Sequence, residues 1–350
     1  MENSNTLDHE ELITEEDGIM VDNLPDSVVA SMEVRDRWFT TSSPSGDTKS
    51  FLIGDLVRWL PGQTLRVAFL GGDTALHRDI EDATRQITDA CNIKLDFGFN
   101  PTTGKYRTWS TSDTTYSAEI RVSFDQGGYF SLLGNDSISP NIGAPGQPVG
   151  GRPNQRSLNL GGFHVQRPAS WKGTTRHEFL HALAFHHEHQ SPSGGCDSEF
   201  RWEDDPGYQP TRNAQGVYII DANGKRPGIY TYLAGAPNFW GVAKVDHNLR
   251  QIRTSDVIVG GFDRGSIMLY RFQDFFYRTA PSPCAPIGDG QNLSTSDKAG
   301  LRKIYPHTPN EVESLTERRL GAFKSLLNSE VLSTELKKGV ESQLSLINPQ

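Results

Sequence analysis

Residues 176–189 read RHEFLHALAFHHEH and concentrate five histidines and two glutamates in fourteen positions. The stretch GTTRHEFLHALAF lacks proline and carries apolar residues along one side, which predicts a helix. Side chains four apart on a helix share a face, so His177 and His181 can direct two imidazoles at one zinc ion. Glu178, rotated away from that face, can reach a water beside the metal. The chain must therefore fold to present this helix at a metal site.

A catalytic zinc site needs a third protein ligand. His187 follows His177 by ten residues, as in the pattern H-E-x-x-H-x-x-G-x-x-H, whereas His186 is one residue short and His189 two beyond. A glutamate on a second helix is the rival, but Glu199 follows SPSGGCDS, which does not predict a helix. His187 is the best candidate, and His186 and His189 are interpreted as bystanders.

The pattern's glycine is replaced by Ala184. If the chain must adopt a left-handed conformation there to leave the helix, alanine costs about 1–2 kcal/mol. For the five-residue string alone, an accidental occurrence on an ordinary helix remains an alternative interpretation.

Composition excludes several classes of partner. The chain has 350 residues, with 34 basic and 43 acidic ones and a formal charge of -9, so neither nucleic acid nor an anionic membrane is an expected partner. The N-terminus lacks a secretory signal, and no apolar run is long enough to span a bilayer, so we expect a soluble protein. Three cysteines allow at most one disulfide, with Cys196 and Cys284 as a candidate pair. The oligomeric state is not predicted.

The hydrophobic pattern predicts an α+β fold. Residues 1–50 are acidic and polar, and we expect them to lie outside the core. Residues 74–90 have helical spacing, with Thr74 as the expected N-cap, and residues after 190 predict long loops with little sheet. Residues 308–350 predict an amphipathic helical extension. Strands are expected at 65–69, 93–97, 118–124, 127–133 and 157–163.

The strings HEFLHALAFHHEHQSP and DRGSIMLY together resemble the signature of the astacin-like metzincin zinc endopeptidases. The resemblance covers residues 51–307. It implies a metzincin-type fold, with a mixed twisted sheet and two long helices in an N-terminal subdomain and an irregular C-terminal subdomain. A zinc cleft would then lie between 51–187 and 188–307, and residues 1–50 could be a pro-segment.

The resemblance also implies roles for individual residues. Met268 would form a hydrophobic floor beneath the zinc, and Glu188 would be a buried acid that pairs with the N-terminus of the processed enzyme. Leu269 replaces the usual histidine of the Met-turn. One Zn²⁺ would be held by His177, His181 and His187, with Glu178 as general base and Tyr270 as a second catalytic residue.

The implied reaction is hydrolysis of peptide bonds by a zinc-activated water, with a protein or peptide bound extended along an edge strand near Gly128–Gly134. FLIGD, residues 51–55, is reminiscent of the family's pro-segment motif, in which an aspartate, here Asp55, occupies the zinc of the latent enzyme. Secretion is expected from the resemblance alone. Two alternatives are an inactive zinc-containing binding module of the same fold and a zinc amidase acting on cell-wall crosslinks.

Overall fold

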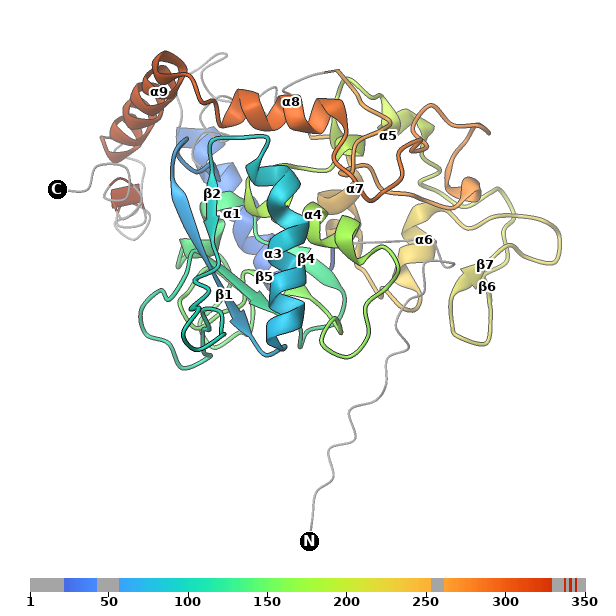
Figure 1. Ribbon diagram of the computed structural model, residues 1–350. Helices are drawn as coiled ribbons and strands as arrows, with labels where there is room; N and C mark the ends of the chain where they lie inside the picture. The colour runs from blue at the N-terminus through green and yellow to red at the C-terminus, as the bar shows by residue number, and fades with distance from the viewer. Residues whose placement is uncertain are drawn as a thin grey trace, which may run out of the picture.

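The computed structural model describes residues 22–42, 57–252 and 261–328, together with 337, 340, 341 and 344. Figure 1 shows a sheet with helices packed on it, and a second region of short helices and loops beside them. Asp55 lies outside the described residues.

A five-stranded mixed sheet forms the first layer, with strand order β2-β1-β3-β5-β4. The first four strands in this order are parallel, and β4 pairs antiparallel with β5. The expected α+β class is confirmed, and β4 lies at the edge of the sheet. The bounds are β1 Thr64–Leu70, β2 Lys94–Asp96, β3 Ile120–Ser123, β4 Tyr129–Ser131 and β5 Leu158–Leu160.

Two long helices, α3 (Thr74–Thr88) and α4 (Trp171–Ala182), pack against each other, and α4 also contacts β4 and β5. Their shared core contains the apolar positions that alternate along β1, such as Leu65 and Val67, which are fully buried. The prediction that Thr74 is the N-cap of α3 is wrong by one residue, because Asp73 holds this position. The Asp73 carboxylate accepts a 2.8 Å hydrogen bond from the Leu76 amide, because its short acidic side chain satisfies an otherwise free amide of the first turn.

The chain after residue 190 contains short helices and a two-stranded sheet, as its loop-forming sequence predicts. A second hydrophobic cluster holds this region together and includes a disulfide between Cys196 and Cys284. The elements are α5 Cys196–Glu199, β6 Thr211–Arg212, β7 Tyr218–Ile219, α6 Ile229–Ala234 and α7 Val242–Leu249. Three single turns of 3-10 helix lie at η2 Gly134–Ile138, η3 Glu188–Gln190 and η5 Asp274–Phe276.

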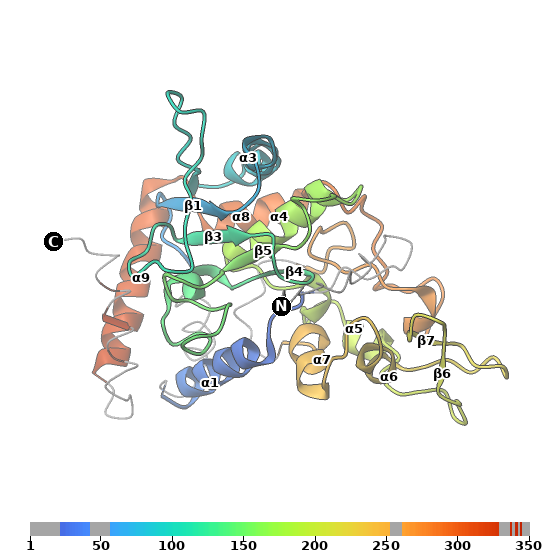
Figure 2. The same cartoon turned by 90° about the horizontal axis from the view of Figure 1, so that it is seen from below.

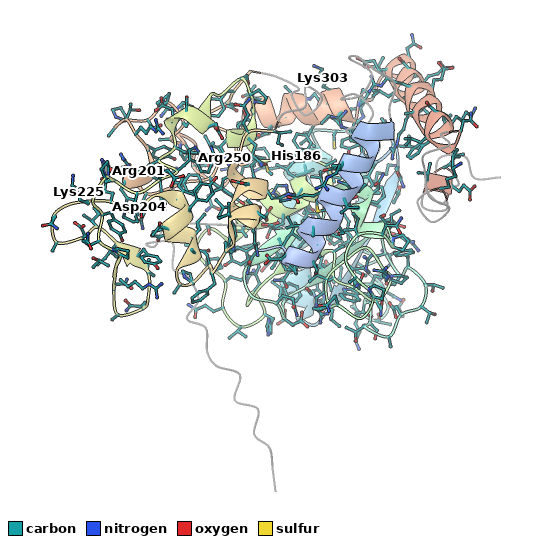
Figure 3. All side chains as sticks on the ribbon, turned by 180° about the vertical axis from the view of Figure 1, so that it is seen from behind. His186, Arg201, Asp204, Lys225, Arg250 and Lys303 are labelled. Atoms are coloured by element: carbon teal, nitrogen blue, oxygen red, sulfur yellow. A yellow bond between two sulfur atoms is a disulfide. The ribbon has the colours of Figure 1, made fainter. Side chains whose placement is uncertain are left out.

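Residues 22–42, called the N-terminal segment below, pack on the domain, so the expectation that residues 1–50 lie outside the core is wrong for this part. Helix α1 (Asp26–Ser42) packs against α7, and its apolar side joins a third buried cluster with Phe130 and Leu132. Figure 2 shows α1 and α7 side by side, and Figure 3 shows α1 crossing the face opposite to that of Figure 1. The segment contributes Leu24, Val28, Val29 and Met32 to this cluster.

Two helices lie in the described part of the chain after residue 290. Helix α8 (Thr295–Ile304) begins with a capping box between Ser294 and Asp297, and α9 spans Pro309–Leu327. Phe323 and Leu326 of α9 are buried. Over the described ranges, no helix combines the length and apolar character required to cross a bilayer.

Candidate metal centre

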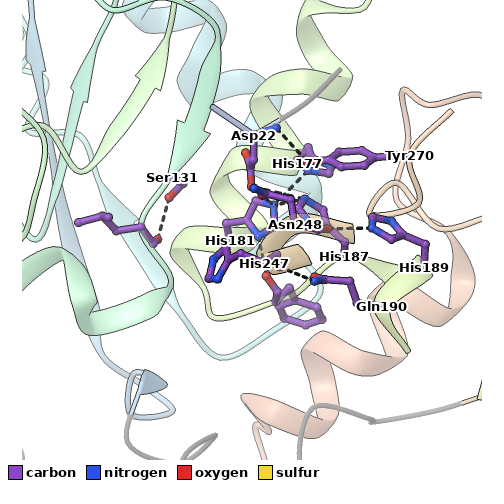
Figure 4. Close-up of polar contacts among 12 residues, drawn as sticks. Asp22, Ser131, His177, His181, His187, His189, Gln190, His247, Asn248 and Tyr270 are labelled. Carbon is purple, nitrogen blue, oxygen red and sulfur yellow. Dashed lines mark hydrogen bonds and ion pairs between the residues drawn. The ribbon is translucent and has the colours of Figure 1, made fainter. Parts of the chain in front are cut away.

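Three histidines converge at the C-terminal end of α4 (Figure 4). The Nε2 atom of His181 lies 3.1 Å from Nε2 of His177 and 3.1 Å from Nε2 of His187. All three side chains are buried. Helical spacing places the first two on one face of α4, and the turn after the helix returns the third toward them.

Backbone carbonyls orient two of these rings. Nδ1 of His177 lies 2.9 Å from the Ile267 carbonyl oxygen, and Nδ1 of His181 lies 2.6 Å from that of Phe185. A carbonyl can only accept, so each Nδ1 donates and each Nε2 of a neutral ring presents a lone pair. Burial lowers the pKa of His177 to about 4, with nearby His181 adding to the effect. Neutral imidazoles with converging lone pairs are the form that binds a metal.

Ala184 permits the return of the chain through a left-handed conformation. Its φ is 68°, so the position requires the geometry for which the sequence pattern places glycine. The Ala184 amide donates to the His181 carbonyl, and the next amide, that of Phe185, donates to the Leu180 carbonyl. Alanine in place of glycine therefore preserves the turn, at the energetic cost of a left-handed backbone conformation.

Asp22 is the fourth member of the group. Its Oδ2 atom lies 3.1 Å from His181 Nε2 and 3.4 Å from His187 Nε2. Burial alone would raise the pKa of this carboxyl, but the charge and hydrogen bonds of His181 and His187 hold it well below its usual value. Sequence reasoning missed Asp22.

The four ligand atoms fit a zinc ion. Bonds of about 2.0–2.1 Å in a tetrahedron separate neighbouring ligand atoms by roughly 3.3 Å, close to the observed 3.1–3.4 Å. Asp22 Oδ1 is buried and has no hydrogen-bond partner in the described structure. A cation held among the three rings would satisfy a carboxylate placed in this way.

Glu178 lies beside this group and is also buried. Burial raises the pKa of its carboxyl well above the usual value, and the neighbouring charge of Asp22 raises it further. Oε2 of Glu178 has no partner among the described residues. The Glu178 carboxyl can therefore carry a proton next to the metal ligands.

Tyr270 packs over the histidines. Its ring centroid lies 4.2 Å from that of His187 and 5.7 Å from that of His177. Its hydroxyl accepts a 2.9 Å hydrogen bond from the Asp22 amide, so the N-terminal segment engages both the metal ligands and this tyrosine.

Met268 and Glu188 lie in two separate segments that a backbone hydrogen bond joins beside the site. Met268 is buried in the main core, and its carbonyl accepts a hydrogen bond from the Glu188 amide. The Glu188 carboxylate accepts a 2.8 Å bond from the Asp263 amide. Asp297 of α8 accepts bonds from Ser266 and from the Ile267 amide, which fixes the turn that contains Met268 from the other side.

His186 and His189 are not in the group of four. His189 is nonetheless packed against the site, because its ring stacks on Tyr270 with centroids 5.0 Å apart and its Nε2 contacts the Asn248 carbonyl. It is therefore a packing residue rather than an unrelated bystander.

The N-terminal segment also occupies the edge strand. Asp22 and Tyr129 form a parallel bridge, and the Asn23 amide donates a 2.9 Å hydrogen bond to the Tyr129 carbonyl. The edge near Gly128–Gly134 is thus able to pair with an extended segment beside the metal ligands.

Comparison with known proteins finds no family model and no curated protein that matches. Solved structures are similar over 72% of this chain. A structure of myroilysin is 24% identical, with 97% of its chain covered and a TM-score of 0.46, and a crystal structure of myroilysin is 22% identical, with 86% covered and a TM-score of 0.40. High choriolytic enzyme 1, a hatching enzyme zinc-protease from the medaka Oryzias latipes, is 17% identical, with 95% covered and a TM-score of 0.39.

Proposed function

We propose that the protein is a zinc-dependent endopeptidase in a latent form. The observation that carries the proposal is the convergence of the Nε2 atoms of three buried imidazoles beside the buried carboxyl of Glu178. His177, His181 and His187 would hold the ion. When bound, zinc supplies Lewis-acid polarisation of a carbonyl and acidifies water at the site.

The chain's own residues would carry the proton transfers. Glu178 takes a proton from the attacking water and returns it to the nitrogen of the leaving amine. The Tyr270 hydroxyl, once released from the Asp22 amide, donates a hydrogen bond to the developing oxyanion.

The edge strand β4 supports binding of an extended peptide. Main-chain groups of a peptide can pair with an open edge as an added strand, and the segment at Asp22 and Asn23 already pairs with Tyr129 in this way. The N-terminal segment would act as a pro-segment that fills the substrate path and places the Asp22 carboxylate at the metal. Its removal would give the active form.

Glu178→Gln tests the proposal. The full-length chain is folded with a recognition sequence for a site-specific protease inserted after Thr48, is then cut, and is separated from its N-terminal fragment; we refer to the remaining part as the cut chain. The parent should bind one zinc and cleave casein, whereas Glu178→Gln should keep the zinc and lose roughly 10²–10⁴-fold in rate, because the proton acceptor is lost.

The exposed Glu203→Gln serves as the matched control and should retain both properties. A cut parent that binds zinc but leaves casein intact would favour a binding module of the same fold. Equal cleavage by the parent and Glu178→Gln would exclude the assigned base.

A further inference from the structure

The turn between α4 and the third histidine is held by two side chains that come from distant parts of the chain. Tyr305, the C-cap residue of α8, donates a 2.8 Å hydrogen bond from its hydroxyl to the Leu183 carbonyl oxygen. Trp59, in the segment before β1, donates a 2.7 Å hydrogen bond from Nε1 to the Ala182 carbonyl oxygen. The two acceptors are consecutive residues at the end of α4, directly before the left-handed Ala184.

These carbonyls need donors from outside the helix. The last carbonyls of a helix have no intrahelical partner, and a buried carbonyl without a donor destabilises the fold. The amides of Ala184 and Phe185 donate to the carbonyls of His181 and Leu180, and the two carbonyls that follow accept from the indole and the hydroxyl instead. Burial raises the pKa of the Tyr305 hydroxyl far above its usual value, so the hydroxyl keeps its proton and donates.

The same turn sets the positions of two metal ligands. The Phe185 carbonyl oxygen lies 2.6 Å from Nδ1 of His181 and thereby orients that ring. His187 lies two residues further along the chain and directs its Nε2 at Nε2 of His181. Because Leu183 and Ala184 connect α4 to both groups, movement of their peptide would displace the Phe185 carbonyl and His187 together.

The turn is strained and is packed closely on two sides. A φ of 68° is unfavourable for a residue with a side chain, so Ala184 keeps this conformation only while its surroundings hold it. A Cβ atom at Gly134 would lie 3.0 Å from the Ala184 Cβ, and one at Gly300 of α8 would lie 3.2 Å from Cε1 of Phe185. Both donor side chains are buried as well. The hydrogen bonds therefore join the turn to fixed surroundings.

We propose that Tyr305 and Trp59 are positioning residues of the metal centre, which keep His181 and His187 in the geometry that binds zinc. They act through the carbonyls at the end of α4, not through the ion. Trp59 follows the cut after residue 48, so both donors stay in the cut chain. This inference rests on the zinc centre of the proposed function.

Zinc affinity of the intact full-length chain tests the proposal. Tyr305→Phe removes the hydroxyl and keeps the ring, and competition with a chelating dye should show an affinity for zinc about tenfold lower than that of the parent. Trp59→Phe, which removes the other donor, should also lower it. Tyr208→Phe is the matched control, because the buried Tyr208 hydroxyl donates a 2.9 Å hydrogen bond to the Ile219 carbonyl, away from α4. It should lower the melting temperature and leave zinc affinity unchanged.

Cobalt(II) in place of zinc gives a second measurement, because its visible absorption depends on the arrangement of its ligands. Tyr305→Phe and Trp59→Phe should change the spectrum, whereas Tyr208→Phe should retain that of the parent. Unchanged affinity and spectrum in Tyr305→Phe, with a lower melting temperature, would assign its hydroxyl to stability alone and overturn the proposal.

The outcome for the metal centre is separate from the outcome for catalysis. Weaker zinc binding by Tyr305→Phe, together with a cut parent that binds zinc but leaves casein intact, supports the positioning role and rejects the endopeptidase. Casein cleavage by the cut parent with unchanged zinc affinity in Tyr305→Phe rejects the positioning role and leaves the endopeptidase in place. An intact parent that binds neither metal would overturn both.

Discussion

The backbone amide of Asp22 donates a 2.9 Å hydrogen bond to the hydroxyl of Tyr270, a residue 248 positions later in the chain. The Asp22 side chain meanwhile lies among the histidine ligands. One residue of the N-terminal segment therefore contacts both the metal centre and the tyrosine proposed to stabilise the oxyanion. The N-terminal segment and a substrate would therefore compete for the metal centre and for the Tyr270 hydroxyl.

Asp22→Ala should partly release this inhibition in the intact chain. The lost charge-assisted contact is worth about 1.5–3 kcal/mol, which corresponds to a roughly ten- to hundred-fold gain in casein cleavage. Activity should remain below that of the cut chain, because α1 still contributes Val28 and Met32 to a buried cluster.

Asp26→Asn is the matched control for Asp22→Ala, because it removes a carboxylate from the same segment at an exposed position. It should leave the intact chain latent. Equal activation by both substitutions would mean that the segment inhibits through its general charge rather than through Asp22 at the metal.

Ala184→Gly should stabilise the protein slightly. Glycine removes about 1–2 kcal/mol of left-handed strain but gains chain entropy in the unfolded state worth about 0.4–1 kcal/mol, so the free energy of unfolding should rise by up to about 1.6 kcal/mol. Ala182→Gly, within α4, should instead lower it by about 0.5–1 kcal/mol. Urea unfolding of both variants measures the contrast, and destabilisation by Ala184→Gly would show that its buried methyl outweighs the strain.

The sequence predicted the part of the site that depends on local geometry. His177 and His181 share a helix face because of the helical period, and His187 follows after a turn of fixed length, so spacing alone brings them together. The edge position of β4 was expected only from the family resemblance, because the order of strands depends on pairing between distant segments. The N-cap of α3 at Asp73 shows the usual uncertainty of one residue at a helix end.

Asp22 could not be predicted in the same way, because its place among the histidines depends on the packing of a segment remote in sequence. A usable signal did exist. Leu24, Val28, Val29 and Met32 have the spacing of an amphipathic helix, although the acidic, polar composition of residues 1–50 concealed it. An amphipathic helix directly after Asp22 must pack its apolar side on another surface. Its prediction would therefore have indicated that Asp22 is held against the domain.

Glu188 should make stability depend on pH. Burial raises the pKa of its carboxyl to about 7, with Asp297 and Asp263 adding to the effect and the Asp263 amide opposing it. Between about pH 4.5 and 7 the folded state holds a proton that the unfolded state has released, so the free energy of unfolding falls as pH rises through this window. The loss is on the order of 2 kcal/mol, given partial exposure of the group.

Glu188→Gln should flatten this part of the stability curve, since the amide cannot ionise. Urea unfolding at several pH values, with zinc-loaded intact chains, measures the slope. The exposed Glu203→Gln should preserve the parent's slope. An unchanged slope in Glu188→Gln would assign the pH dependence to another group.

The disulfide between Cys196 and Cys284 should stabilise the region that carries α5 to α7. It closes a loop of sequence separation 88, for which chain entropy predicts a contribution of about 4–5 kcal/mol as an upper estimate. Cys284→Ser should therefore lower the melting temperature and increase proteolysis after residue 190, while Cys91→Ser, at the buried free cysteine, should leave proteolysis there unchanged. If Cys284→Ser changed neither the melting temperature nor proteolysis after residue 190, the region would be held by its hydrophobic cluster rather than by the crosslink.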